Sequence, residues 1–164
     1  MRTDRPQRRQ TVARGRSRIG QEIRIAGWRE WCALPGLGVH RIKAKLDTGA
    51  RTSALHAIDI VPVRVSGSPW VKFKLHPEQR STTLTVACRA RVMDLRWIRN
   101  PGQRRERRYI IVTPITVGGV QWDIELALTA RDEMGFRLLL GRTALRRGIL
   151  IDPARSFRLS SKET

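Results

Sequence analysis

Hydrophobic and polar residues alternate along most of this chain. The longest alternation spans residues 84–92, where apolar side chains occupy every second position. A period of two places successive side chains on opposite faces of an extended chain, which is typical of half-buried β-strands. The same type of pattern, or a run of β-branched and aromatic residues, occurs at 23–25, 42–46, 61–65, 71–75, 109–113 and 122–128. Many short strands separated by turns predict an all-β barrel or sandwich.

Turn and helix signals complete this prediction. Residues 117–120 read Val-Gly-Gly-Val, which favours a tight hairpin turn. Between Asp94 and Arg108 lies a polar stretch with Pro101-Gly102 at its middle. It predicts a long hairpin, whose tip is either a solvated loop or a flap that meets an anionic ligand. The tip arginines are Arg99, Arg104, Arg105, Arg107 and Arg108. One short helix is expected, from Arg142 to Arg147, ended by Gly148.

The charge balance adds a partner class. Lys and Arg number 33 against 14 acidic residues, which gives a formal net charge of +19 over 164 residues. This excess favours a polyanionic partner such as nucleic acid, an anionic membrane or an acidic peptide. No apolar run is long enough for a membrane helix. Cys32 and Cys88 are too few for a disulfide framework. We therefore expect a cytoplasmic protein with no membrane partner.

The chain divides into three parts by composition. Residues 1–20 carry seven arginines and almost no large apolar side chain, so we expect a disordered basic arm. This arm is either a solubilising leader or an anchor on RNA or the ribosome. Residues 21–159 form the single predicted domain, and residues 160–164 form a C-terminal tail.

The candidate chemistry is at Leu46-Asp47-Thr48-Gly49-Ala50, directly after the predicted strand 42–46. An apolar strand that runs into Asp-Thr-Gly places a carboxylate on a tight loop at the strand end. Glycine permits close backbone approach there, and the threonine hydroxyl can bond to neighbouring backbone groups. By itself, an Asp-Thr-Gly tripeptide most often marks a plain turn. A second motif, Leu138-Leu139-Leu140-Gly141-Arg142, raises the odds of a catalytic site.

The two motifs together resemble the retropepsin-type aspartic proteases, which have a hydrophobic strand, Asp-Thr-Gly-Ala, a flap hairpin, and two apolar residues with Gly before one helix. Residues 25–159 are also similar to one bacterial family, long labelled ATP-dependent zinc proteases and found beside the ribosomal-protein glutamate ligase RimK. The segments that carry this likeness to the RimB-type members are 27–31, 34–35, 43–57, 107–113, 124–126, 139–145 and 152–153.

This resemblance implies a closed acid-protease (retropepsin-like) barrel with one short helix. A chain with one such aspartate would act as a homodimer in which two Asp47 carboxylates activate water, with no cofactor and no metal. Thr48 would brace the loops, Gly49 would line the cleft, and Leu140 and Gly141 would pack beneath the loop. The implied substrate is an acidic peptide, such as the glutamate tail of a ribosomal protein.

One position departs from the retroviral pattern. Those proteases usually carry an acidic residue after Asp-Thr-Gly-Ala, paired with the Arg of the Gly-Arg motif, whereas this chain has Arg51. The role of Arg142 is therefore open. Arg51 and Ala50 are expected to line the cleft, where Arg51 and the flap arginines would bind a substrate carboxylate. Alternatively, Arg51 pairs with Asp132 or Glu133.

Two other function classes remain open. The first is a basic β-barrel that binds RNA or the ribosome without catalysis, as the net charge permits. The second is the zinc protease of the family label. His40, His56 and His76 stand far apart and no His-Glu-x-x-His motif is present, so we expect no metal ligands. A Gly-rich phosphate loop with Lys-Ser/Thr is also absent from the sequence, so ATP dependence has no visible basis.

Overall fold

The computed structural model describes residues 22–99, 105–130, 135–145 and 148–160. The predicted basic arm 1–20, the hairpin tip 100–104 and tail residues 161–164 lie outside these ranges. The strands and helical segments, in chain order, are β1 Arg24–Gly27, β2 Arg29–Leu34, the 3₁₀ turn η1 Pro35–Leu37, β3 Val39–Leu46, β4 Ser53–His56, β5 Ile58–Val65, β6 Ser68–Leu75, β7 Val86–Arg91, β8 Asp94–Arg99, β9 Arg105–Val117, β10 Val120–Thr129, β11 Leu138–Leu140, α1 Arg142–Leu145 and β12 Ile149–Asp152.

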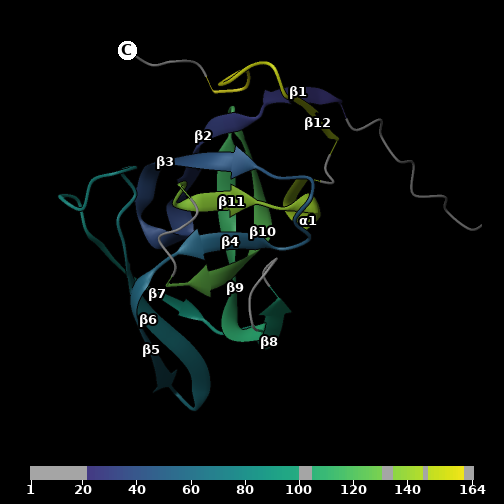
Figure 1. The fold of residues 1–164 in the computed structure, drawn as a ribbon. Helices are drawn as coiled ribbons and strands as arrows, with labels where there is room; N and C mark the ends of the chain where they lie inside the picture. Colours follow the sequence, from purple (N-terminus) through teal and green to yellow (C-terminus); the bar gives the residue numbers. More distant parts are fainter. Residues whose placement is uncertain (1–21, 100–104, 131–134, 146–147, 161–164) are drawn as a thin grey trace, which may run out of the picture.

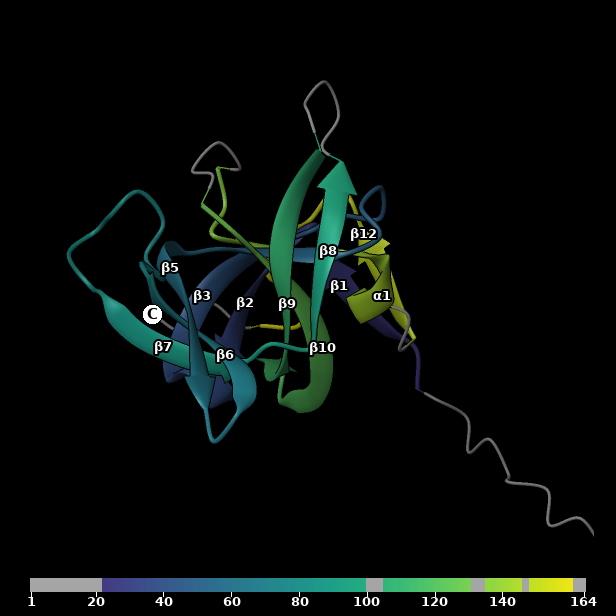
Figure 2. The same cartoon turned by 90° about the horizontal axis from the view of Figure 1, so that it is seen from below.

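Six strands close into a barrel, which confirms the predicted fold class (Figure 1). Their order is β10-β4-β11-β3-β2-β9, and β9 pairs back onto β10. Closure depends on the length of β9. One edge of β9 pairs with β10, while the other edge pairs with β8 near its start and with β2 near its end. Figure 2 shows β8 beside β9, its antiparallel partner.

Strand β11 lies between two strands that are consecutive in the sequence. The chain leaves β3, passes through residues 47–52 and returns as β4, yet β3 and β4 each pair with β11. The β11–β3 pairing is parallel, with Leu140 opposite Leu46, and the β11–β4 pairing is antiparallel. This insertion brings the Leu138–Leu140 motif beside the Asp47 loop. The two motifs that are far apart in the sequence, at Asp47 and at Leu138–Arg142, are therefore in direct contact in the structure.

The buried core follows the alternation of the sequence. Ile42, Ala44 and Leu46 of β3 face inward, as do Leu138 and Leu140 of β11. A second sheet, in the order β5-β6-β7, packs its apolar side chains into the same cluster. The alternation at 84–92 overestimated one strand, since β7 covers only Val86–Arg91 and Leu84 is exposed. The alternation begins two residues before Val86, the first residue of β7 with a strand partner.

A short parallel pair, β1 with β12, joins the two ends of the described domain. The segment that follows β12 runs back along β2 and is fixed by Glu30, which is fully buried. The Glu30 carboxylate accepts hydrogen bonds from five donors, namely the backbone N–H groups of Gly27, Arg158, Leu159 and Ser160 and the hydroxyl of Ser160. A buried carboxylate is tolerated here because its oxygens are hydrogen-bonded.

The only described α-helix, α1, has four residues, Arg142–Leu145. Residues 146 and 147, the end of the predicted helix, lie outside the described ranges. Within the described part of the chain, no helix is long and apolar enough to cross a membrane.

Candidate active site

The Asp47 carboxylate lies in the loop between β3 and β4, and its own loop sets its orientation. Oδ1 accepts hydrogen bonds from the backbone N–H groups of Gly49 at 2.9 Å and Ala50 at 3.2 Å. Oδ2 lies 4.0 Å from the Nζ atom of Lys45, and the side chain is 28% exposed. One carboxylate oxygen is thus held by loop amides, while the side chain keeps access to solvent. This geometry suits a carboxylate that must meet a ligand in a defined direction.

Strand β11 holds the loop from below. The backbone N–H of Asp47 donates to the carbonyl of Leu140 at 2.8 Å, and the N–H of Gly141 donates to the Ser53 hydroxyl at 3.0 Å. Gly141 packs so closely that an added Cβ would lie 2.8 Å from the carbonyl carbon of Thr52. A side chain does not fit at this distance, so glycine is required for contact between β11 and the loop.

The side chain of Arg142 braces the Asp47 loop by binding the backbone of that loop. The guanidinium Nη1 donates to the carbonyl oxygens of Thr48 and Gly49, both at 3.0 Å. The following residue, Thr143, donates its hydroxyl to the Arg51 carbonyl at 3.1 Å. The departure at Arg51 left the role of Arg142 open, and the structure answers it. Arg142 binds loop carbonyls, which needs no acidic residue in the loop.

Arg51 itself is exposed, at the end of the loop. Its charge lowers the pKa of Glu125, although the larger cause is the hydrogen bonding of Glu125 to Arg96. Arg96 bridges Glu125 at 2.7 Å and Asp94 at 2.6 Å. Asp132 and Glu133, the alternative partners, lie outside the described residues.

The flap arginines occupy strands of the β8–β9 hairpin. Arg99 and Arg105 are opposite each other in the register, and both are exposed. The guanidinium of Arg107 lies 5.6 Å from the Trp97 ring. Arg108 differs from the others because it is 5% exposed and donates to Glu106 at 3.0 Å. Arg104 lies outside the described ranges. The hairpin thus presents exposed cations at Arg99, Arg105 and Arg107, while Arg108 is a buried ion-pair residue.

The described donors do not fit a zinc site. No group of three His, Cys, Asp or Glu side chains in the described ranges is arranged to hold a metal ion. His56 is buried in β4, where its backbone N–H donates to the Arg137 carbonyl. Burial raises the pKa of the Cys88 thiol to about 11 and raises that of Cys32 as well. Thiols with raised pKa values are poor sources of the thiolate that zinc prefers.

The sequence analysis missed two residues that position this site. Ser53 accepts from Gly141, and Lys45 places its ammonium group near the Asp47 carboxylate. Neither has a motif of its own, although Lys45 is the polar position directly before Leu46 in the alternating strand. Of the predicted site residues, the structure brings together Asp47, Thr48, Gly49, Ala50, Arg51, Leu140, Gly141 and Arg142.

The fold and the site define a barrel of the retropepsin-like aspartic peptidase class. A closed barrel carries Asp-Thr-Gly after one strand, and a Leu-Gly-Arg segment inserts beside it. Residues 25–162 match the family described as RimB-like, retropepsin-like aspartic endopeptidase RimB, and the chain belongs to this family.

The chain is also similar to parts of longer proteins and to a solved structure. A protein of Shewanella pealeana named probable alpha-L-glutamate ligase is 49% identical over 138 residues, which cover 84% of this chain and 30% of that protein. A protein of Desulfotalea psychrophila with the same name is 44% identical, covering 83% of this chain and 30% of that one. The matching part of the chain thus spans 30% of the length of these curated relatives. A Legionella pneumophila crystal structure of unknown function superposes with a TM-score of 0.69 at 27% identity, covering 82% of this chain and 97% of that chain.

Proposed function

We propose that this protein is an aspartic peptidase that works as a homodimer, in which each protomer contributes one Asp47. The observation that carries the proposal is the Asp47 loop. Its carboxylate is oriented by two amide donors, and its loop is braced by Gly141 and Arg142, which directly follow β11. A loop held by this many backbone contacts presents a carboxylate with little freedom, as catalysis by positioning requires.

The proposed chemistry needs no metal and no covalent intermediate. Two Asp47 carboxylates that face each other across a two-fold axis repel when both are ionised, so the pair shares one proton. The ionised carboxylate takes a proton from a bound water, which attacks the scissile carbonyl. The protonated partner donates its proton to the carbonyl oxygen, and a second proton transfer to the amine lets the C–N bond break.

The proposed substrate is an acidic peptide, and a glutamate tail on a ribosomal protein is the specific case. The net charge of +19 attracts such a chain. Exposed Arg51 lies on the Asp47 loop, and Arg105 and Arg107 extend from the flap hairpin. The relatives named as glutamate ligases contain a region similar to this chain, which supports a link to glutamate chains. A basic arm at 1–20 would add contacts with the ribosome or its RNA.

A paired cleavage assay tests the proposal. Wild-type protein and its Asp47→Asn variant are incubated with a ribosomal-protein peptide that ends in a glutamate tail, and mass loss is followed with and without EDTA. Glutamate loss with the wild type alone, unchanged by EDTA, is the expected result. Loss that stops with EDTA would contradict the aspartic mechanism, and equal loss with Asp47→Asn would remove Asp47 from the chemistry. Specific activity that rises with protein concentration would support the homodimer.

A further inference from the structure

The outward face of β3 carries a row of cations that leads to Asp47. Arg41, Lys43 and Lys45 occupy alternate positions, and Arg29 of β2 lies opposite Lys45 in the register. Alternate residues of a strand repeat every ~6.7 Å on one face, so the row covers about 20 Å between Arg41 and Asp47. We call Arg29, Arg41, Lys43 and Lys45 the cation row.

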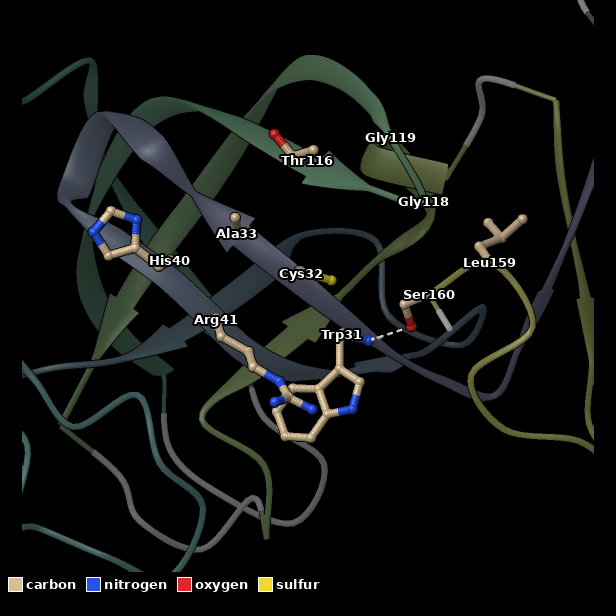
Figure 3. A pocket seen from close by; sticks show the side chains of 10 residues that line it. All are labelled: Trp31, Cys32, Ala33, His40, Arg41, Thr116, Gly118, Gly119, Leu159 and Ser160. Carbon is tan, nitrogen blue, oxygen red and sulfur yellow. Dashed lines mark hydrogen bonds between the residues drawn. The ribbon is translucent and has the colours of Figure 1, made fainter. Parts of the chain in front are cut away.

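Aromatic side chains hold these cations in place. The Arg41 guanidinium lies 3.9 Å from the centre of the Trp31 ring, and Figure 3 shows these two side chains together. The Lys43 ammonium lies 5.0 Å from the same ring centre. Trp31 stacks on Phe157 with a centroid distance of 5.7 Å, and the Arg29 guanidinium lies 5.2 Å from the Phe157 ring. Cation–π contacts of this kind order a charged side chain without neutralising it. The row is therefore positioned before any ligand arrives.

Acidic partners for the row are scarce. Within the described ranges, Arg29, Arg41 and Lys43 form no ion pair, and Lys45 meets a carboxylate only at Asp47, at 4.0 Å. The pKa of Lys43 is lowered by burial and then by neighbouring positive charges, including Arg29 and Arg41. Arg41 and Lys43 line one side of a groove of about 570 Å³, whose other residues include a single carboxylate, Glu78. The positive charges of the row repel one another, and an anionic ligand would reduce this repulsion.

We propose that the cation row binds the carboxylates of an extended acidic peptide, one on every second residue, and leads the peptide to Asp47. Side chains on one face of an extended peptide repeat at the same ~6.7 Å spacing as the row, so successive carboxylates meet successive cations. This proposal rests on the peptidase function and names the residues that select its substrate. A nucleic acid fits less well, because the Trp31 ring already contacts Arg41, Lys43 and Phe157 and is no free platform for a base.

Binding to the Asp47→Asn protein tests the row without cleavage. The probe is a fluorescein-labelled hexaglutamate peptide, and the readout is fluorescence anisotropy at low ionic strength. The Arg41→Gln/Lys43→Gln variant is expected to raise the Kd about tenfold, since it removes two charge contacts. The matched control is Lys72→Gln/Arg89→Gln, which removes the same charge from an exposed cross-strand pair of β6 and β7. It is expected to change the Kd less than about twofold, since distant charges are screened.

Three results would overturn the proposal. The first is an equal Kd for hexaglutamate in the row variant and in the control. The second is no binding of hexaglutamate to the Asp47→Asn protein. The third is that the row variant loses more affinity for heptauridylate than for hexaglutamate. The last result would assign the surface to nucleic acid. The Lys43→Arg variant keeps the charge and should bind like the parent, which separates loss of charge from loss of folding. The binding test uses the Asp47→Asn protein and therefore needs no cleavage. A negative result for peptide binding to the cation row is thus distinguishable from a negative result in the cleavage assay.

Discussion

Replacing Gly141 by alanine tests how the candidate site is held together. Gly141 follows β11 directly, and its missing side chain lets the backbone of the Asp47 loop approach. An added Cβ would lie 2.8 Å from the Thr52 carbonyl carbon and 2.9 Å from the carbonyl oxygens of Arg51 and Thr52. These three nearest atoms all belong to the backbone, so no rotamer change relieves the overlap with them. β11 and the loop must move apart until these distances exceed about 3.4 Å, the lower bound of ordinary contact.

The expected cost follows from the overlap and from the bonds that cross this contact. Overpacking a close-packed site typically costs about 1–3 kcal/mol. The same separation stretches the Gly141 N–H bond to the Ser53 hydroxyl, now 3.0 Å, and the Arg142 N–H bond to the Ala50 carbonyl, now 2.8 Å. Weakening two hydrogen bonds adds up to about 1 kcal/mol each. We expect Gly141→Ala to lower the free energy of unfolding by about 2–4 kcal/mol.

Urea denaturation of the wild type and the variant measures this loss, and the glutamate-tail cleavage assay measures its effect on the site. Gly119→Ala is the control, since Gly119 has a φ of +77° and no atom within 4 Å of an added Cβ. That control is expected to cost about 1 kcal/mol through backbone conformation alone and to leave cleavage unchanged. If Gly141→Ala unfolds within about 0.5 kcal/mol of the wild type, close packing against Thr52 does not hold the loop.

Three further predictions follow from other contacts. Arg142→Ala removes the donor to the Thr48 and Gly49 carbonyls, so kcat for the glutamate-tail peptide should fall more than KM rises, with a stability loss of about 1 kcal/mol in urea. Glu30 has a pKa below its ordinary value of 4.5: burial raises it, but hydrogen bonds from Ser160 and three backbone N–H groups outweigh burial. Its stabilising contribution is therefore present above pH 4.5 and is lost as the pH falls through the lowered pKa. Glu30→Gln should remove that part of the pH dependence of stability. At pH 7 it should lower the free energy of unfolding by about 3 kcal/mol, as measured by denaturation. Leu150 is 56% exposed and lies beside Ile25 in the β1–β12 pair, so we expect it to lie in the contact between protomers. Leu150→Glu should therefore lower the fraction of protein that sediments as a dimer without lowering the stability of the monomer.

Much of the fold could be read from the sequence because its strands are half-buried. The alternation at 42–46 and 71–75 correctly predicted β3 and β6, and the Gly118-Gly119 turn correctly predicted the β9–β10 hairpin. The ends of strands were less predictable, as at Leu84, because apolar alternation also occurs in residues that precede the hydrogen-bonded ladder. The β8–β9 hairpin was expected from its flanking strands, but the polar residues of 94–99 and 105–108 form its strands as well as its tip.

The sequence by itself singled out Asp47 and the Gly141 motif, because each motif is a run of consecutive residues that can be recognised in the chain. Only the tertiary structure decided how the two meet, since insertion of β11 between β3 and β4 brings together residues such as Arg142 and Thr48, which are 94 positions apart. It also decided that Arg142 binds loop carbonyls and that Glu30 fixes the C-terminal segment. The physical reason is that a local pattern determines which face of a strand is buried, whereas the partner of a charged or polar group depends on which distant backbone the closed barrel brings within hydrogen-bond distance.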